Sequence, residues 1–360
     1  MNWVLRTVLI VVWLALAAAG RVSARPPEAG GTGPERPPGP IPLRIVAPVH
    51  GLFYQLTPAS AAPLEADRST LRLELSESNV LHCCATTEPP FFRPTVDLEI
   101  TRLQIAYRRG LGGGWQLGVE VPLFYYHEGF LDGLIYGTER LFGKTKPRRE
   151  AERRDRYTYE IRRGDDVLFQ GPRAEPGLGN MALTFTRRLW TQDGRRPGLA
   201  VRGGLSVPTG DRDRAFGSGI VEAALGVAAE WHRGRWTLNG GGAFTLPLDQ
   251  VDETPGFTNV PVLAGYLEAA HTLGPRAAVH LQVAAQTGPF RAQGGPPLDT
   301  PLPRKHKRGL THHIVQLSPA VSWRLDADRT LYLGFVQDFI ESGDSAADAT
   351  VFATLSWGLP

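Results

Sequence analysis

Apolar and polar side chains alternate along this chain in repeated segments of about ten residues. Residues 115–123 show this most plainly, because Trp, Leu, Val, Val and Leu occupy every second position. Successive side chains of a strand point to opposite faces, so each segment has one apolar and one polar face. A strand of this length crosses a bilayer when it is tilted by about 45°. The sequence therefore predicts strands that traverse a membrane.

The connections between these segments are alternately short and long, which fixes how many segments count as strands. The predicted strands are 71–76, 96–107, 115–123, 180–190, 198–208, 219–232, 236–246, 260–272, 276–287, 312–325, 329–339 and 350–359. A further strand-like stretch at 156–161 is assigned to a hairpin within a long external loop, 126–179, because this keeps the alternation strict. The predicted fold is all-β: an up-and-down antiparallel transmembrane β-barrel of about 12 strands.

The apolar phase of the second strand changes at Thr101–Arg102, where Val96, Leu98 and Ile100 give way to Leu103 and Ile105. An extra residue in a strand shifts its phase by one position. The pattern therefore indicates a β-bulge at this point.

The tryptophans that follow residue 24 lie beside short turns or near the end of the sequence. They are Trp115, Trp190, Trp231, Trp236, Trp323 and Trp357. Indole favours a membrane–water interface, with its ring in the apolar zone and its N–H toward water or headgroups. These residues are predicted to form an interfacial girdle on the short-turn side. A soluble β-sandwich with tryptophans near its turns is the alternative.

The N-terminus divides into two parts before the predicted barrel, 67–360. Residues 1–24 are typical of a signal peptide, with Arg6, an apolar run and a small-residue site at Val22-Ser23-Ala24. Residues 25–66 are rich in proline and are expected either to run in the periplasm or to enter the barrel as a plug. Export of a chain of such strands predicts the outer membrane of a Gram-negative bacterium.

The net charge excludes one class of partner. The chain has 39 Lys and Arg and 36 Asp and Glu, and cleavage of the predicted signal peptide would remove Arg6 and Arg21. Without a basic field, nucleic acid is not an expected partner. Expected partners are membrane lipid, the barrel-insertion machinery and lipopolysaccharide. The basic loop 304–308 is expected to face the phosphates of lipopolysaccharide. The alternative is that this loop is simply solvated. A small-molecule ligand is also compatible with the sequence.

The polar strand faces are predicted to line a lumen. Their candidate residues are Arg72, Glu74, Asp97, Glu99, Glu120, Arg202, Glu222, Glu230, Glu268, His280, Gln282 and Asp338. Acids outnumber bases in this set, so an open lumen is expected to favour cations. In a closed lumen the same side chains would pair with one another.

The long loop 126–179 is the most elaborated part of the sequence. Its apolar residues near 130–142 approximate one face of a short helix, and arginines and acids follow. Long barrel loops often carry function, so Phe130, Leu131, Asp132, Arg148 and Arg149 are candidates for a gate. An ordered cap whose charges pair internally is the alternative.

Catalytic and metal-binding patterns are weak. His280 and Ser322 are expected within reach of each other on adjacent strands, but the sequence indicates no third member of a triad. Cys83 and Cys84 are adjacent, and with His82 they fall short of a metal site. We therefore predict neither an enzyme nor a cofactor or metal.

Several motifs resemble a family of bacterial barrel-type envelope proteins with a domain of unknown function. They are Gly129-Phe130-Leu131-Asp132-Gly133 with Leu141-Phe142-Gly143, Gly177-Leu178-Gly179-Asn180, Val207-Pro208-Thr209-Gly210-Asp211 and Gly217-Ser218-Gly219. Asn180 stands where the family usually has Asp, and the final Pro360 departs from the usual aromatic end. The resemblance implies the fold and the outer-membrane location but no activity.

The leading functional expectation is a channel or transporter-like barrel for a small solute or an apolar compound. The alternatives are a filled structural or binding barrel of the envelope and, third, an outer-membrane lipid hydrolase that uses Ser322. A plug formed by residues 25–66 would favour the filled barrel.

Overall fold

The computed structural model describes residues 39–45, 47, 50–82, 92–133, 135, 137, 157–163, 166–171, 174–249, 257–292, 313–338 and 349–359. The predicted signal peptide, Cys83, Cys84, Arg148, Arg149 and the basic loop 304–308 lie outside these residues.

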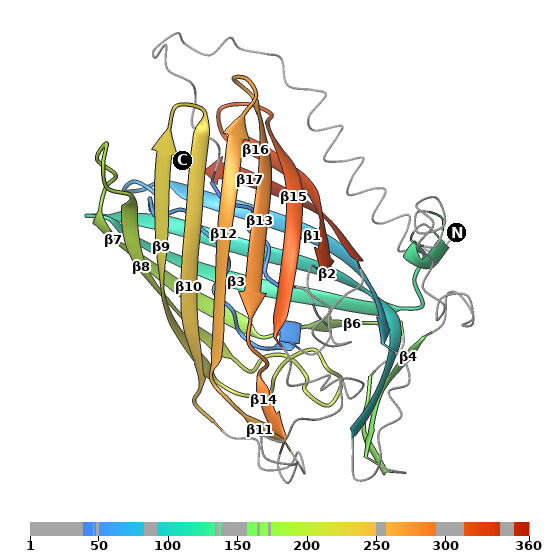
Figure 1. Ribbon diagram of the computed structural model, residues 1–360. Coiled ribbons are helices and arrows are strands. Elements are labelled where there is room, and N and C mark those ends of the chain that lie inside the picture. Colours follow the sequence, from blue (N-terminus) through green and yellow to red (C-terminus); the bar gives the residue numbers. More distant parts are fainter. Residues whose placement is uncertain are drawn as a thin grey trace, which may run out of the picture.

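A closed antiparallel barrel forms the body of the protein (Figure 1). Its twelve strands are β1 (Ser69–His82), β2 (Phe92–Gly112), β3 (Trp115–His127), β7 (Met181–Trp190), β8 (Gly198–Val207), β9 (Glu222–Arg233), β10 (Trp236–Pro247), β12 (Val262–Thr272), β13 (Ala277–Gln286), β15 (Ile314–Arg324), β16 (Arg329–Asp338) and β17 (Ala349–Leu359). Neighbouring strands pair in chain order, and β17 pairs with β1 from Ser69↔Leu359 to Asn79↔Ala349. The predicted up-and-down barrel is confirmed.

Shorter strands extend the sheet at its long-loop end. β4 (Thr158–Arg163) and β5 (Asp166–Gln170) form a hairpin inside the long loop, and β4 pairs with the start of β2. β6 (Glu175–Leu178) pairs with the end of β3, whereas β11 (Phe257–Asn259) and β14 (Phe290–Ala292) make a separate ribbon. The hairpin expected near residue 156 is therefore present.

The outer face of the barrel carries an exposed apolar belt. Leu267 is 72% exposed, and other large apolar side chains share this face: Leu117, Leu183, Leu225, Leu263, Leu281, Leu333 and Phe335. Trp115, Trp190, Trp236, Trp323 and Trp357 are about half exposed at the short-turn end, and Trp231 is half-buried. Such a belt beside aromatic residues is what a transmembrane barrel presents to lipid. Among the described residues, no helix has the length and apolar character needed to cross a membrane.

The predicted bulge at Thr101–Arg102 is wrong. β2 pairs with β1 without a register shift from Val96 to Arg109, and its irregularity lies at Gly110–Gly112. The strand keeps its phase, so Leu103 faces outward whereas Ile100 faces inward. Inside, Val96, Leu98 and Ile100 join a buried cluster with Phe124 and Tyr126. The change of apolar phase therefore marks where the lipid belt ends and an internal hydrophobic core begins.

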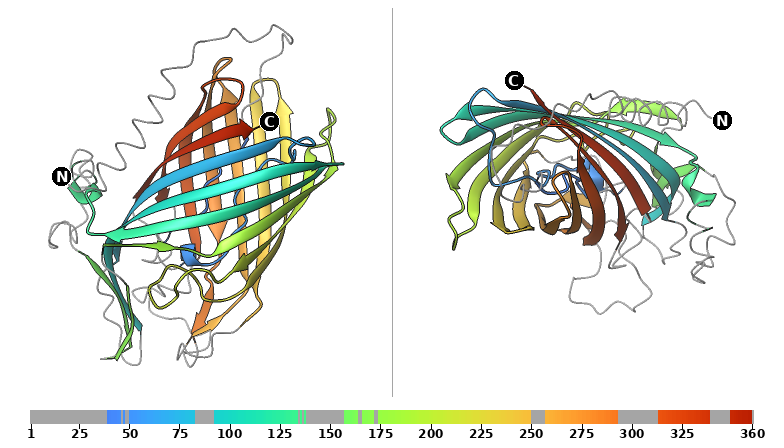
Figure 2. Two further views of the ribbon diagram at one scale, coloured as in Figure 1. Left: turned by 180° about the vertical axis from the view of Figure 1, so that it is seen from behind. Right: turned by 90° about the horizontal axis from the view of Figure 1, so that it is seen from above.

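The first described segment of the chain lies inside the barrel. Seen from above, the trace before β1 runs within the ring of strands (Figure 2). It contains one short 3-10 helix, η1 (His50–Leu52). The interior is therefore occupied by the chain itself.

A charge placed in the belt tests its contact with lipid. We expect Leu267→Arg to lower the free energy of unfolding from lipid vesicles by about 2–4 kcal/mol, because a guanidinium near the bilayer midplane loses hydration. Leu248→Arg, just beyond β10, should cost about 0–1 kcal/mol. Equal effects of the two substitutions in urea titrations would contradict this placement.

Candidate functional site: the occupied lumen

The described residues of the range 39–64, hereafter the lumen segment, enter and leave the barrel at the short-turn end. The Ile41 N–H donates to Glu268 Oε2 at 2.5 Å, four residues from the end of β12. At the other end of the segment, the Leu64 N–H donates to Gln116 Oε1 at 3.0 Å, near the start of β3. Between them, Leu52 of η1 packs against the internal core at the long-loop end. The lumen segment therefore crosses the lumen twice, as a hairpin.

Wall glutamates accept the N–H and O–H groups of this segment. The Tyr54 N–H donates to Glu222 Oε1 at 3.1 Å, and the Ser60 hydroxyl donates to Glu230. Because the lumen segment is not paired as a strand of the barrel, its backbone groups need other partners. Buried carboxylates need donors for the same reason, so the two sets satisfy each other.

Glu120 is the centre of the charged contacts. It forms an ion pair with Arg44 of the lumen segment and lies 3.6 Å from Arg108 Nη2 of β2. Thr57 Oγ1 donates to its Oε2 at 3.1 Å. Arg202 Nη1 donates to the Thr57 carbonyl at 2.7 Å, so both passes of the segment are fixed to this wall.

Further wall groups hold the segment by its peptide groups. The Tyr266 hydroxyl donates to the Ala59 carbonyl at 2.8 Å. Gln282, with its amide nitrogen turned toward the segment, donates to the Ile41 carbonyl at 3.1 Å and to Glu268 at 3.3 Å. The Ile41 peptide is thereby held at both its N–H and its carbonyl.

Most predicted lining residues are buried on the inner face. They are Arg72, Glu74, Glu120, Arg202, Glu222, Glu230, Glu268, His280 and Gln282. Asp338 pairs through its backbone with Gln316, whose side chain is buried, but the Asp338 side chain lies outside the described parts.

Asp97 and Glu99 are on the outer face, and their prediction as lining residues is wrong. Glu99 pairs with Asn79 and His127, which stand on the same face as the lipid belt. The predicted bulge would have turned them inward, and the strand has no bulge there.

Arg102 and Arg108 also face inward, because the phase of β2 is unbroken; neither was predicted as a lining residue. Arg102 Nη1 lies 3.7 Å from Glu74 Oε1. With Arg44, Arg72 and Arg202, these arginines balance the wall glutamates. The predicted excess of acids is therefore not found among the described inward-facing side chains.

His280 and Ser322 lie together as expected, and a third residue completes the arrangement. His280 Nε2 is 2.8 Å from Ser322 Oγ, and Nδ1 is 3.1 Å from Glu268 Oε1. All three residues are at most 4% exposed, and Glu268 also accepts the Ile41 N–H. The three side chains are arranged like a Ser–His–Glu triad, but they are buried beneath the lumen segment. The arrangement supports Glu268 as an acceptor for that segment.

The connection between β8 and β9 packs over the lumen segment at the long-loop end. Phe216 stacks on Tyr126 with ring centroids 5.3 Å apart, and the Tyr126 hydroxyl donates to the Ala215 carbonyl at 2.5 Å. A Cβ added at Gly177 would lie 2.3 Å from the Phe216 ring. Glycine is therefore required where β6 passes beneath this ring.

Asn180 joins the motifs that carried the family resemblance. Its Oδ1 accepts the Gly210 N–H at 3.2 Å, and its Nδ2 donates to Ser218 Oγ at 2.8 Å. Ser218 in turn donates to Glu222 at 2.9 Å. An aspartate cannot donate, so the amide that departs from the family pattern suits this junction.

The start of the long loop is not where a lumen gate requires it. The N–H groups of Phe130 and Leu131 donate to Glu99 at 2.9 and 2.6 Å, and Asn79 donates to Asp132 at 2.9 Å. These contacts place Phe130, Leu131 and Asp132 on the outer face of β1–β3. For these three residues the gate prediction is wrong, because Glu99 faces outward.

Comparisons with known proteins agree with this architecture. The chain belongs to the family described as "Protein of unknown function (DUF3187)", whose profile matches residues 31–291. No curated protein sequence matches it. An outer membrane channel from Pseudomonas putida F1 is 12% identical, with a TM-score of 0.54 over 85% of this chain and 100% of that one. The CymD monoaromatic hydrocarbon channel is 8% identical, with a TM-score of 0.36 over 82% and 88%. The first likeness shows a shared barrel fold.

A substitution at the junction tests the role of the amide. We expect Asn180→Asp to lower the free energy of unfolding by about 1–3 kcal/mol, because Ser218 loses its donor and meets a second carboxylate. Gln170→Glu, an exposed amide-to-acid change, should stay within about 0.5 kcal/mol. Urea unfolding of both variants measures the two free energies of unfolding. Equal values for the two variants would contradict a role for the Asn180 amide.

Proposed function

We propose that this member of the DUF3187 family is an outer-membrane channel for a small solute, and that the lumen segment closes it. In this proposal the mature chain is inserted into the outer membrane of a Gram-negative bacterium by the barrel-insertion machinery, and lipid and lipopolysaccharide surround it. The single observation that carries the proposal is the polar character of the interface between the lumen segment and the wall.

The inner wall beside the lumen segment is polar and incompletely paired. In the described part of the chain, Arg72 Nε and Nη2, both Glu74 oxygens and Gln104 Nε2 accept or donate no hydrogen bond. Ser76 and Thr354 hydroxyls on the same wall share this property. Buried polar groups without partners are costly, so such a wall is suited to water or a polar solute rather than to a dry core. This wall of β17, β1 and β2 is our candidate for the solute path.

A cavity at the short-turn end, between the lumen segment and the strands β7 to β9, is our candidate for a vestibule. Its volume is ≈ 350 Å³, and Ala61, Ala62, Trp190, Glu230 and His232 are among its lining residues. The cavity adjoins the point at which the lumen segment leaves the barrel. Movement of the segment would join this vestibule to the lumen.

Release of the lumen segment is expected to cost less than opening the barrel. A typical hydrogen bond contributes about 0.5–1.5 kcal/mol net. The segment is held by separate side-chain contacts, whereas a barrel strand such as β1 is paired by its backbone on both sides, from Ser69 to Asn79 with β17 and from Ser69 to His82 with β2. The segment can therefore leave while the barrel stays closed.

A filled structural or binding barrel is the second candidate, and the presence of the lumen segment inside the barrel favours it, as expected for a plug formed by residues 25–66. Ile41 and Leu43 pack against Tyr332 and Phe352, and Ile45 packs against Tyr266. These apolar contacts favour a segment that stays in place. Conductance separates the two functions.

Loosening the lumen segment tests the channel. We expect Arg44→Gln to raise the open probability in planar bilayers, because it removes the ion pair with Glu120. Arg68→Gln, which changes an exposed arginine near the short-turn end, should behave as the parent protein. If neither the parent protein nor Arg44→Gln conducts ions while the barrel is shown to be folded, the filled barrel is favoured.

The solute path is tested by a pair of opposite charge changes. We expect weak ion selectivity in the parent protein, because arginines balance the glutamates of the wall. Arg72→Gln should shift the reversal potential toward cation preference, and Glu74→Gln should shift it toward anion preference. If neither substitution moves the reversal potential, the ions do not pass along this wall.

A further inference from the structure

A polar cluster lies on the outer face of the barrel, next to the lipid belt on its long-loop side. The last apolar rung across β1, β2 and β3 is Leu75↔Leu103↔Leu123. The next outward rungs, in order, are Glu77↔Thr101↔Tyr125 and Asn79↔Glu99↔His127. Three adjacent strands therefore bring two carboxylates and an imidazole together just beyond the apolar zone.

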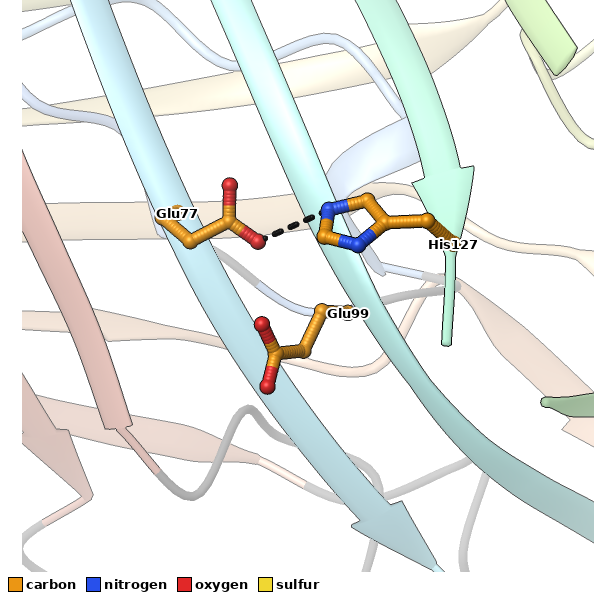
Figure 3. A group of neighbouring side chains, drawn as sticks. All are labelled: Glu77, Glu99 and His127. Carbon is orange, nitrogen blue, oxygen red and sulfur yellow. Dashed lines mark ion pairs between the residues drawn. The ribbon is translucent and has the colours of Figure 1, made fainter. Parts of the chain in front are cut away.

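Glu77, Glu99 and His127 point toward one another (Figure 3). One ligand atom from each lies within 4.8 Å of the other two, and the residues are 5%, 0% and 8% exposed. Glu77 Oε1 lies 3.0 Å from His127 Nε2 and accepts no hydrogen bond. This oxygen is a buried ligand atom directed into the cluster.

The negative charge of the cluster is not balanced by a lysine or an arginine of the described residues. Within the described residues, neither Glu77 nor Glu99 pairs with a lysine or an arginine. The Gly129 N–H donates to His127 Nδ1 at 3.1 Å, so a neutral ring carries its proton on Nε2 and adds no charge. Two carboxylates buried this close repel each other unless a proton or a cation joins them.

We propose that Glu77, Glu99 and His127 bind a divalent cation of the zinc class. Carboxylate oxygen and imidazole nitrogen are ligands that zinc accepts, at about 2.0–2.2 Å. Three protein ligands leave a fourth position for water or a further group. The cation neutralises the two carboxylates and takes the place of the Nε2 proton.

The site lies beneath the start of the long loop and is coupled to it. Phe130 and Leu131 donate their N–H groups to Glu99, so a ligand of the cation also anchors the loop. Gly129 adopts a φ of 89°, and a Cβ there would lie 2.2 Å from the Glu99 carboxyl carbon. Cation binding moves the imidazole proton to Nδ1, which breaks the Gly129 hydrogen bond and shifts this turn.

Zinc titration of the refolded, chelator-treated mature chain tests the proposal. Calorimetry should show one tight site, and its affinity should fall at least tenfold in Glu77→Gln and in His127→Gln. Glu175→Gln, a half-exposed acid near the same end of the barrel, should retain the affinity of the parent. Heat-dependent gel mobility of each variant confirms that the barrel is folded.

Two outcomes would overturn the site. The first is the absence of zinc binding, which would leave a shared proton between the carboxylates. The second is equal binding in the parent and in His127→Gln, with binding lost in the double variant Cys83→Ser/Cys84→Ser; the ligands would then be the thiols. The result is independent of conductance, so it stands or falls separately from the channel.

Discussion

The structure depends on mutual satisfaction of polar groups inside the barrel. The lumen segment brings N–H and carbonyl groups into an interior where no neighbouring strand pairs with them, and the wall brings carboxylates that need donors. Glu222 and Glu268 accept backbone N–H groups, and Glu120 meets Arg44. Removing either set leaves the other buried without partners. The acidic wall and the lumen segment are therefore one unit, and neither is fully described without the other.

The inversion of phase in β2 links the interior to the outer surface. After Thr101 along the chain, the apolar side chains of the strand, such as Leu103, face lipid. Before it, those of Leu98 and Ile100 face an internal core. Polar residues change sides at the same place, so Glu99 emerges outside, where the start of the long loop covers it. One unbroken strand thus places a lumen wall at one end and a polar surface cluster at the other.

The sequence predicted the strands and their number well, because alternation and loop length are local properties. It predicted the lining residues only where the apolar phase stays constant, as at Glu222 and Glu268. It failed at Asp97 and Glu99, because a change of environment and an inserted residue produce the same pattern. Contacts such as Glu268 with His280, or Arg44 with Glu120, arise from closure of the barrel and entry of the lumen segment, which no local pattern specifies.

We infer that the lumen segment moves independently of a barrel that stays closed. Amide hydrogen exchange of the mature protein in lipid nanodiscs tests it most directly, because exchange reports local opening. The claim predicts that the amides of Ile41 and Tyr54 exchange many times faster than the paired amides of β10 and β12. Exchange of these amides at the slow rate of the strands would contradict it and would make the segment a permanent part of the core.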